Sequence, residues 1–104
     1  MAVAFEHRPG PRNLITDVPG VLVGVAGDEA VRTGVTVVLC TDSVAGAVDV
    51  RGGGPGTRDT EILAAEGLVG RAHAFVLTGG SALGLGAADA VSEALSARGE
   101  GLLL

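Results

Sequence analysis

The stretch VLTGGSALGLGAADAV, residues 76–91, decides the fold because the spacing of its apolar residues changes at the glycine pair at 79–80. The residues before the pair are bulky and apolar, which is typical of a buried strand. After the pair, the apolar and small positions recur at intervals of four, three and four residues, as on one face of a helix. Those positions are Gly84, Ala88, Val91 and Leu95. The sequence therefore predicts a strand over 73–79, a glycine turn, and one long helix over 81–98.

The predicted helix has residues suited to both of its ends. Ser81 stands where an N-cap side chain would accept a hydrogen bond from a free backbone N–H group. Arg98 falls in the last turn, and Gly99 suits the left-handed position that ends many helices. We therefore expect the helix to begin at Ser81 and to end at Arg98, with Gly99 as its C-terminal cap.

Working outward, three more segments are rich in β-branched residues. VLVGVA at 21–26 follows a Pro-Gly turn, VTVVLC at 35–40 is nearly continuous, and VAGAVDV at 44–50 is a weaker strand. Their closeness in the chain predicts antiparallel hairpins, and their apolar character predicts strands covered on both faces. TEILAAEGLV predicts a short helix that begins near Asp59 or Thr60 and ends at Gly67.

The glycine turn fails three tests for known chemistry. A nucleophile elbow requires G-x-S-x-G, but Leu83 stands two residues after Ser81. A Walker loop requires a lysine, and the chain contains none. A dinucleotide fingerprint would put Asp89 where the third glycine belongs. Two interpretations remain, namely a helix start that holds an anion or oxyanion and a tight corner that lets strand and helix pack closely.

The loop RGGGPGTRDT, residues 51–60, also allows two interpretations. Its flanking arginines, Arg51 and Arg58, could hold a carboxylate beside the free glycine amides, or they could pair with nearby acids. The nearby acids are Asp49, Asp59 and Glu61. His73, at a strand start, is interpreted as structural. No group of residues has metal-ligand spacing, so we expect neither a metal nor another cofactor.

Composition narrows the function classes. The 104 residues suit one small domain or part of a larger protein, and the net charge of −5 without lysine argues against nucleic acid or membrane partners. The single cysteine, Cys40, is expected to be buried in a reducing compartment. The start MAVAFEHRPG lacks a signal-peptide pattern, and we therefore expect the cytoplasm. With 18 glycines and only two aromatics, the core is weak, which favours dependence on a partner or on further sequence.

Four segments in order resemble one family. They are NLITDVPGVLVG at 13–24, TGVTVVL at 33–39, VDVRGGGPGTRDT at 48–60, and the stretch at 76–91. Together they are similar to the N-terminal part of the L-aminopeptidase/D-esterase (DmpA-like) family, whose relatives include beta-peptidyl aminopeptidases and nylon-oligomer hydrolases. The resemblance covers about residues 13–100, and each motif alone is weaker than the ordered set.

The resemblance implies an α/β (α+β) fold, part of a four-layer α/β/β/α sandwich with a mixed or antiparallel sheet and one long helix. It divides the chain into a flexible arm at 1–12 and an N-terminal portion of a hydrolase domain at 13–104. It also implies an oligomeric, self-cleaving aminopeptidase that acts on short peptides, amides or esters. The nucleophile would be the new N-terminal serine or threonine of a complementary C-terminal subunit. On this view, the chain itself holds no catalytic residue.

The same resemblance gives the turn a role in binding substrate. It implies that a substrate pocket is lined by residues of the turn, which are Thr78, Gly79, Gly80, Ser81 and Leu83. Leu83 stands where the family often has an aromatic residue, and Ala90 replaces a frequent glycine. The alternative is a stand-alone module that binds a small ligand or anion without catalysis.

Overall fold

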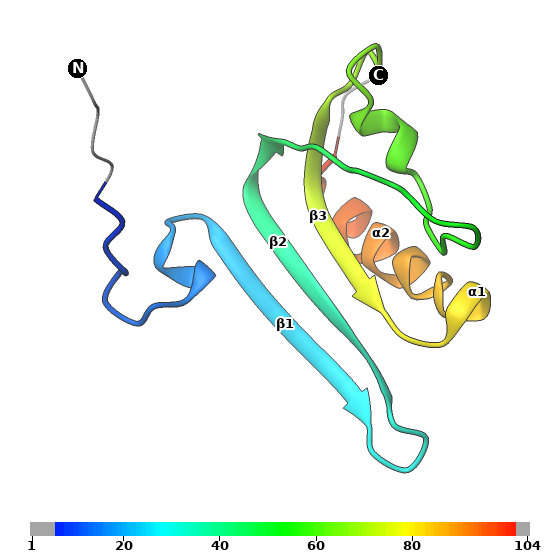
Figure 1. Cartoon of the computed structure of the whole chain (residues 1–104). Helices are drawn as coiled ribbons and strands as arrows, with labels where there is room; N and C mark the ends of the chain where they lie inside the picture. The colour runs from blue at the N-terminus through cyan, green and yellow to red at the C-terminus, as the bar shows by residue number, and fades with distance from the viewer. Residues whose placement is uncertain (1–5, 102–104) are drawn as a thin grey trace.

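The computed structural model describes residues 6–101 and places a three-stranded antiparallel sheet beside two helices (Figure 1). The strand order is β1-β2-β3, so each strand pairs with its neighbour in sequence. The elements are η1 (Ile15–Asp17), β1 (Val21–Asp28), β2 (Thr33–Ala45), η2 (Thr60–Leu63), β3 (Arg71–Thr78), α1 (Ser81–Gly84) and α2 (Ala87–Ala97). The predicted α+β class with an antiparallel sheet is confirmed.

The hairpin of β1 and β2 contains two of the predicted strands, each longer than expected. The pairing runs from Val21 opposite Cys40 to Asp28 opposite Thr33, and four residues connect the strands. The Asp28 carboxylate accepts a hydrogen bond from the Ala30 N–H group at 2.8 Å, which stabilises this connection. The polar segment between the two apolar runs is therefore a hairpin turn.

The prediction of a separate strand over 44–50 is wrong. β2 continues through Ala45 after an irregularity between Leu39 and Val44, and residues 46–50 form no strand. The end of β2 pairs with the start of β3, where Arg71 donates hydrogen bonds to the Ser43 Oγ at 2.8 Å and to the Ser43 carbonyl oxygen. Val44 and Ala45 thus extend an existing strand, and the chain leaves the sheet at Gly46.

The predicted helix over 60–67 is also shorter than expected. It is the single 3-10 turn η2, whose N-cap, Asp59, has a left-handed backbone and no side-chain cap. Near it, a Cβ atom added to Gly46 would lie 3.0 Å from Leu63 and 3.4 Å from Phe75. Leu63 therefore lies close to Gly46 and to Phe75 of β3, and η2 contacts β3.

The helix over 81–98 is present but divided. Leu85 and Gly86 separate α1 from α2, and the bonds there run from Gly86 N–H to Leu83 O at 3.3 Å and from Ala88 N–H to Leu85 O at 3.2 Å. These i to i+3 bonds tighten the chain, and two glycines nearby lower its helix propensity. All four positions of the predicted apolar stripe are half-buried, and α2 packs against β3.

The predicted C-terminal cap is confirmed. Gly99 has a φ of 72°, and its N–H group donates to Ser96 O at 3.0 Å. The Glu100 N–H group donates to Leu95 O at 2.9 Å, which completes a Schellman motif. The leucines at 102–104 and the first five residues of the predicted N-terminal arm lie outside the described residues.

Burial is uneven across the sheet. Among the described residues, Cys40 and Ala72 are the buried apolar side chains, at 5% and 8% exposure, so the predicted burial of Cys40 is confirmed. Seven of the eight residues of β1 are exposed, so this strand is not covered on both faces. The solvent-accessible surface area is 8387 Å², which is larger than the value of about 5,300 Å² expected for a compact protein of 10.2 kDa. The radius of gyration of 16.2 Å compares with about 13 Å for a compact chain of this length.

Candidate functional site

The candidate site is the turn between β3 and α1, where the backbone takes two left-handed residues in succession. Gly80 has a φ of 88° and Ser81 a φ of 56°. The prediction that Ser81 is the N-cap is wrong, because Gly80 occupies the N-cap position and no side chain caps α1. Ser81 is therefore the first helical residue, held in a conformation that serine rarely adopts.

Close backbone contact explains why this turn needs glycine. A Cβ atom added to Gly84 would overlap the carbonyl oxygen of Gly79 and lie 2.8 Å from its carbonyl carbon. A Cβ atom added to Gly79 would overlap the Thr33 Oγ1 atom, and the Gly79 N–H group donates to Gly34 O at 2.9 Å. The glycine pair that closes the turn is thus Gly79 and Gly84. In a nucleophile elbow the second glycine would stand one residue earlier, at the position of Leu83.

The five predicted pocket residues differ in exposure and in whether they line the nearby depression. Thr78 is half-buried and donates its hydroxyl hydrogen to Gly79 O at 3.1 Å, while the other four are exposed. Gly79 and Gly80 border an open depression, whose lining does not include Thr78, Ser81 or Leu83. The Leu83 side chain is 95% exposed.

The depression also takes in the end of the β1–β2 hairpin, which sequence reasoning did not place in the site. The remaining lining residues are Gly27, Asp28, Glu29, Arg32, Thr33 and Gly34. The lining of the depression therefore combines glycine backbone with side chains of both charges. The register of the hairpin could have signalled this arrangement, because Gly27 pairs with Gly34 and Gly34 accepts a hydrogen bond from Gly79.

His73, the histidine of β3, does not lie beside Ser81. His73 lies near the start of β3, five residues before the end of the strand at Thr78. At about 3.3 Å per residue, that separation is roughly 16 Å. Ser81 and His73 therefore do not form a serine–histidine pair for nucleophilic catalysis.

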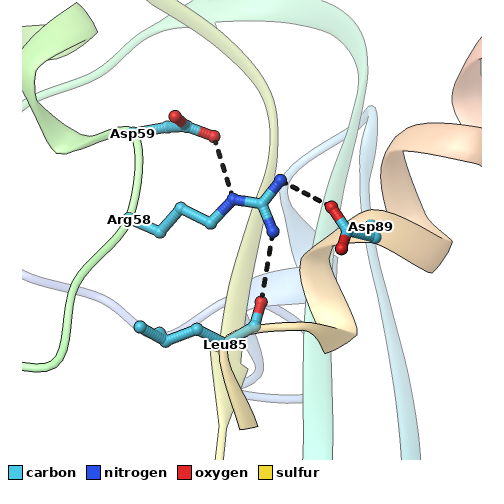
Figure 2. Close-up of polar contacts among 4 residues, drawn as sticks. All are labelled: Arg58, Asp59, Leu85 and Asp89. Carbon is cyan, nitrogen blue, oxygen red and sulfur yellow. Dashed lines mark hydrogen bonds and ion pairs between the residues drawn. The ribbon is translucent and has the colours of Figure 1, made fainter. Parts of the chain in front are cut away.

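Arg58 makes a cluster of polar contacts with Asp59, Leu85 and Asp89 (Figure 2). Arg58 Nη2 is 2.6 Å from Asp89 Oδ1, Nη1 donates to Leu85 O at 3.5 Å, and Nε is 3.5 Å from Asp59 Oδ2. The hydrogen bond and charge of Asp89, followed by the charge of Asp59, raise the pKa of Arg58 above its ordinary value.

The interpretation that both loop arginines pair with nearby acids is confirmed. Arg51 Nε lies 2.8 Å from Asp49 Oδ2, and Arg58 contacts Asp59. Asp89, the closest partner of Arg58, was not foreseen because it lies 31 residues away in the chain. Over residues 6–101, no three potential metal ligands come together, and no helix is long and apolar enough to cross a membrane.

Curated relatives cover most of this chain. An uncharacterized aminopeptidase of Mycobacterium leprae is 42% identical in an alignment of 102 positions, which covers 90% of this chain and 28% of the relative. One of Mycobacterium tuberculosis is 43% identical over 88% of this chain and 29% of its own length. The 6-aminohexanoate-oligomer endohydrolase of Paenarthrobacter ureafaciens is 38% identical over 91% of this chain and 26% of its own length. This chain thus spans just over a quarter of the length of these relatives.

The family comparison agrees with these relatives. The model of peptidase family S58 matches residues 13–101, which include all three strands and both helices. The matched range contains the four motifs on which the resemblance to the DmpA-like family rests, so that prediction is confirmed. The chain belongs to peptidase family S58.

Proposed function

We propose that this chain is the N-terminal part of a self-processing aminopeptidase or amidohydrolase that releases N-terminal residues from short peptides, amides or esters. The observation that carries the proposal is the family match over residues 13–101, with relatives named as aminopeptidases and as an oligomer endohydrolase. The nucleophile lies in the part of those relatives that this chain does not match. Self-cleavage there frees the amine of an N-terminal serine or threonine, which then acts as the base.

In this proposal, the turn at residues 78–84 forms a wall of the substrate pocket. A backbone wall suits a substrate that is itself a peptide or amide, because exposed N–H and C=O groups can hydrogen-bond to it. The glycines Gly79 and Gly80 border the open depression. The N–H group and the carbonyl oxygen of Gly79 already bond to Gly34 and Thr78, so the backbone N–H group that faces substrate is that of Gly80. The exposed Leu83 supplies an apolar contact beside them.

The partner of this chain is a complementary C-terminal subunit, within a homo-oligomer. The apolar side chains of β1 are exposed, with Leu22 at 52% and Val25 at 75%, and β1 is an edge of the sheet. Exposed apolar edge strands favour association. The buried free thiol of Cys40 fits a reducing compartment, and we place the protein in the cytoplasm.

The experiment compares the 104-residue chain with the protein expressed from the longest reading frame that contains it. Each is assayed on aminoacyl p-nitroanilides and short amides, and sedimentation records the state of association. We expect the longer protein to cleave itself, expose a new N-terminal serine or threonine, and hydrolyse the substrates. We expect the short chain to be inactive and to associate or require the second subunit.

Activity of the short chain that is abolished by Ser81→Ala would contradict the proposal and restore Ser81 as a nucleophile. A monodisperse, cooperatively melting monomer of the short chain would contradict its need for a partner. Binding of a small anion by the short chain, without any hydrolysis by the longer protein, would also contradict the proposal.

A further inference from the structure

The loop after β2 crosses from the sheet to the helices with little internal structure. Residues 46–59 form neither strand nor helix, and Figure 1 shows this green segment running down beside α1 and α2. Its hydrogen bonds to the helical segment in the described structure are both made by Arg58, at the end of the loop. The hydrogen bonds of one guanidinium group therefore connect the loop to the helices.

Arg58 contacts both sides of the break between the helices. Nη1 donates to the carbonyl oxygen of Leu85, the C-cap residue that follows α1, and Nη2 pairs with Asp89 in the first turn of α2 (Figure 2). The planar guanidinium group has several donors in a fixed arrangement, so one side chain can hold both groups at once. Lysine could not reproduce this geometry.

The break needs such support because the local chain provides little. Neither α1 nor α2 has a side chain that caps its N-terminus. Gly84, which ends α1, lies against the Gly79 backbone with no room for a methyl group. A shift at Leu85 would therefore move Gly84, and through it the turn that carries Gly79 and Gly80.

We propose that Arg58 is a positioning residue for the substrate pocket, holding the α1–α2 break so that the turn at 78–84 keeps its place. This inference rests on the proposed function. The ion pair is partly exposed, with the Arg58 and Asp89 side chains at 37% and 65%, and exposed pairs contribute little to stability. The role of Arg58 is geometric, and the loss of Arg58 affects substrate binding more than folding.

The same loop offers a matched control. Arg51 pairs with Asp49, two residues away, and their side chains are 84% and 69% exposed. Arg51 thus carries the same charge in the same loop, but its hydrogen bond stays within the loop. Arg51→Gln removes one arginine, as Arg58→Gln does, without touching the helix break.

The test uses the protein from the longest reading frame, with Arg58→Gln, Arg58→Lys, Asp89→Asn and Arg51→Gln. We expect Arg58→Gln and Asp89→Asn to lower kcat/KM on an aminoacyl p-nitroanilide by about 10- to 100-fold, mainly by raising KM. Arg58→Lys should raise KM less than Arg58→Gln does, and Arg51→Gln should leave KM unchanged. A lower kcat with unchanged KM in Arg58→Gln would indicate only a loss of folded protein and would overturn the proposal.

A second measurement separates this inference from the proposed function. Hydrogen exchange follows the amides of Gly86, Ala88 and Asp89, whose hydrogen bonds span the break. We expect their exchange to be at least about 10-fold faster in Arg58→Gln than in Arg51→Gln. If the wild-type protein hydrolyses nothing, the proposed function fails, and this comparison alone decides whether Arg58 positions the break. Equal exchange in the two variants would overturn that role.

Discussion

Two glycine-rich segments of this chain look alike in sequence and differ in structure. In the loop, a Cβ atom added to Gly53, Gly54 or Gly56 would meet nothing within 4 Å. In the turn, a Cβ atom added to Gly79 or Gly84 would overlap another atom. Glycine in the loop therefore affects mainly chain entropy, whereas glycine in the turn allows backbone segments to touch. Only the second kind of glycine places backbone groups at the candidate site.

The largest expected effect is that of Gly84→Ala. The new methyl group would overlap the backbone of Gly79, which cannot move without displacing β3, so we expect the free energy of unfolding to fall by at least about 3 kcal/mol. Denaturant unfolding of the protein from the longest reading frame measures the change.

Gly86→Ala is the control for this variant. Gly86 has a φ of −61°, and the nearest atom to an added Cβ is Leu83 O at an ordinary 3.4 Å. Gly86 is the N-cap of α2 with a helical backbone, so the helix propensity of alanine and the N-cap preference for glycine oppose each other, and Gly86→Ala should change the stability by less than about 1 kcal/mol. Equal stability of Gly84→Ala and the wild type would show that the turn is not closed by the contact of Gly79 with Gly84.

Gly79→Ala should have a smaller effect, because the atom in its way belongs to a side chain. The clash is with Thr33 Oγ1, and we expect a loss of about 1–3 kcal/mol. Thr33→Ala removes that oxygen, so the double variant should recover part of the loss, with a coupling of about 1 kcal/mol in a double-mutant cycle. Strictly additive losses would mean that the hairpin end and the turn do not contact each other through this pair.

Residue type and the spacing of apolar residues predicted those parts of the fold that depend on neighbours in the sequence. Runs of β-branched residues located the strands containing Val25, Val37 and Val76, and the spacing from Gly84 to Leu95 identified the helical face. Gly99 was identified as the C-terminal cap because a left-handed residue there has a strong preference for glycine.

The parts that depend on distant contacts were not predicted. The helix break and the displaced N-cap follow from the backbone contact of Gly84 with Gly79. The spacing of apolar residues in the sequence does not indicate that contact. The strand over 44–50 was wrong because pairing of Val44 with Ala72 extends β2 and then stops. At the site, Asp89 and the hairpin end were missed because the fold, and not the spacing, brings them to Arg58 and to the turn.

The smallest expected effect is that of Gly53→Ala in the loop. The position is open, and its φ lies outside the left-handed region, so alanine fits without strain. Alanine also restricts the unfolded chain, and we expect the free energy of unfolding to rise by about 0.4–1 kcal/mol. Gly52→Ala is the matched control, because Gly52 is equally open but has a φ of 101° and should lose about 1 kcal/mol or more. If both variants lost stability equally, the loop would be packed against something, and its contrast with the turn would fail.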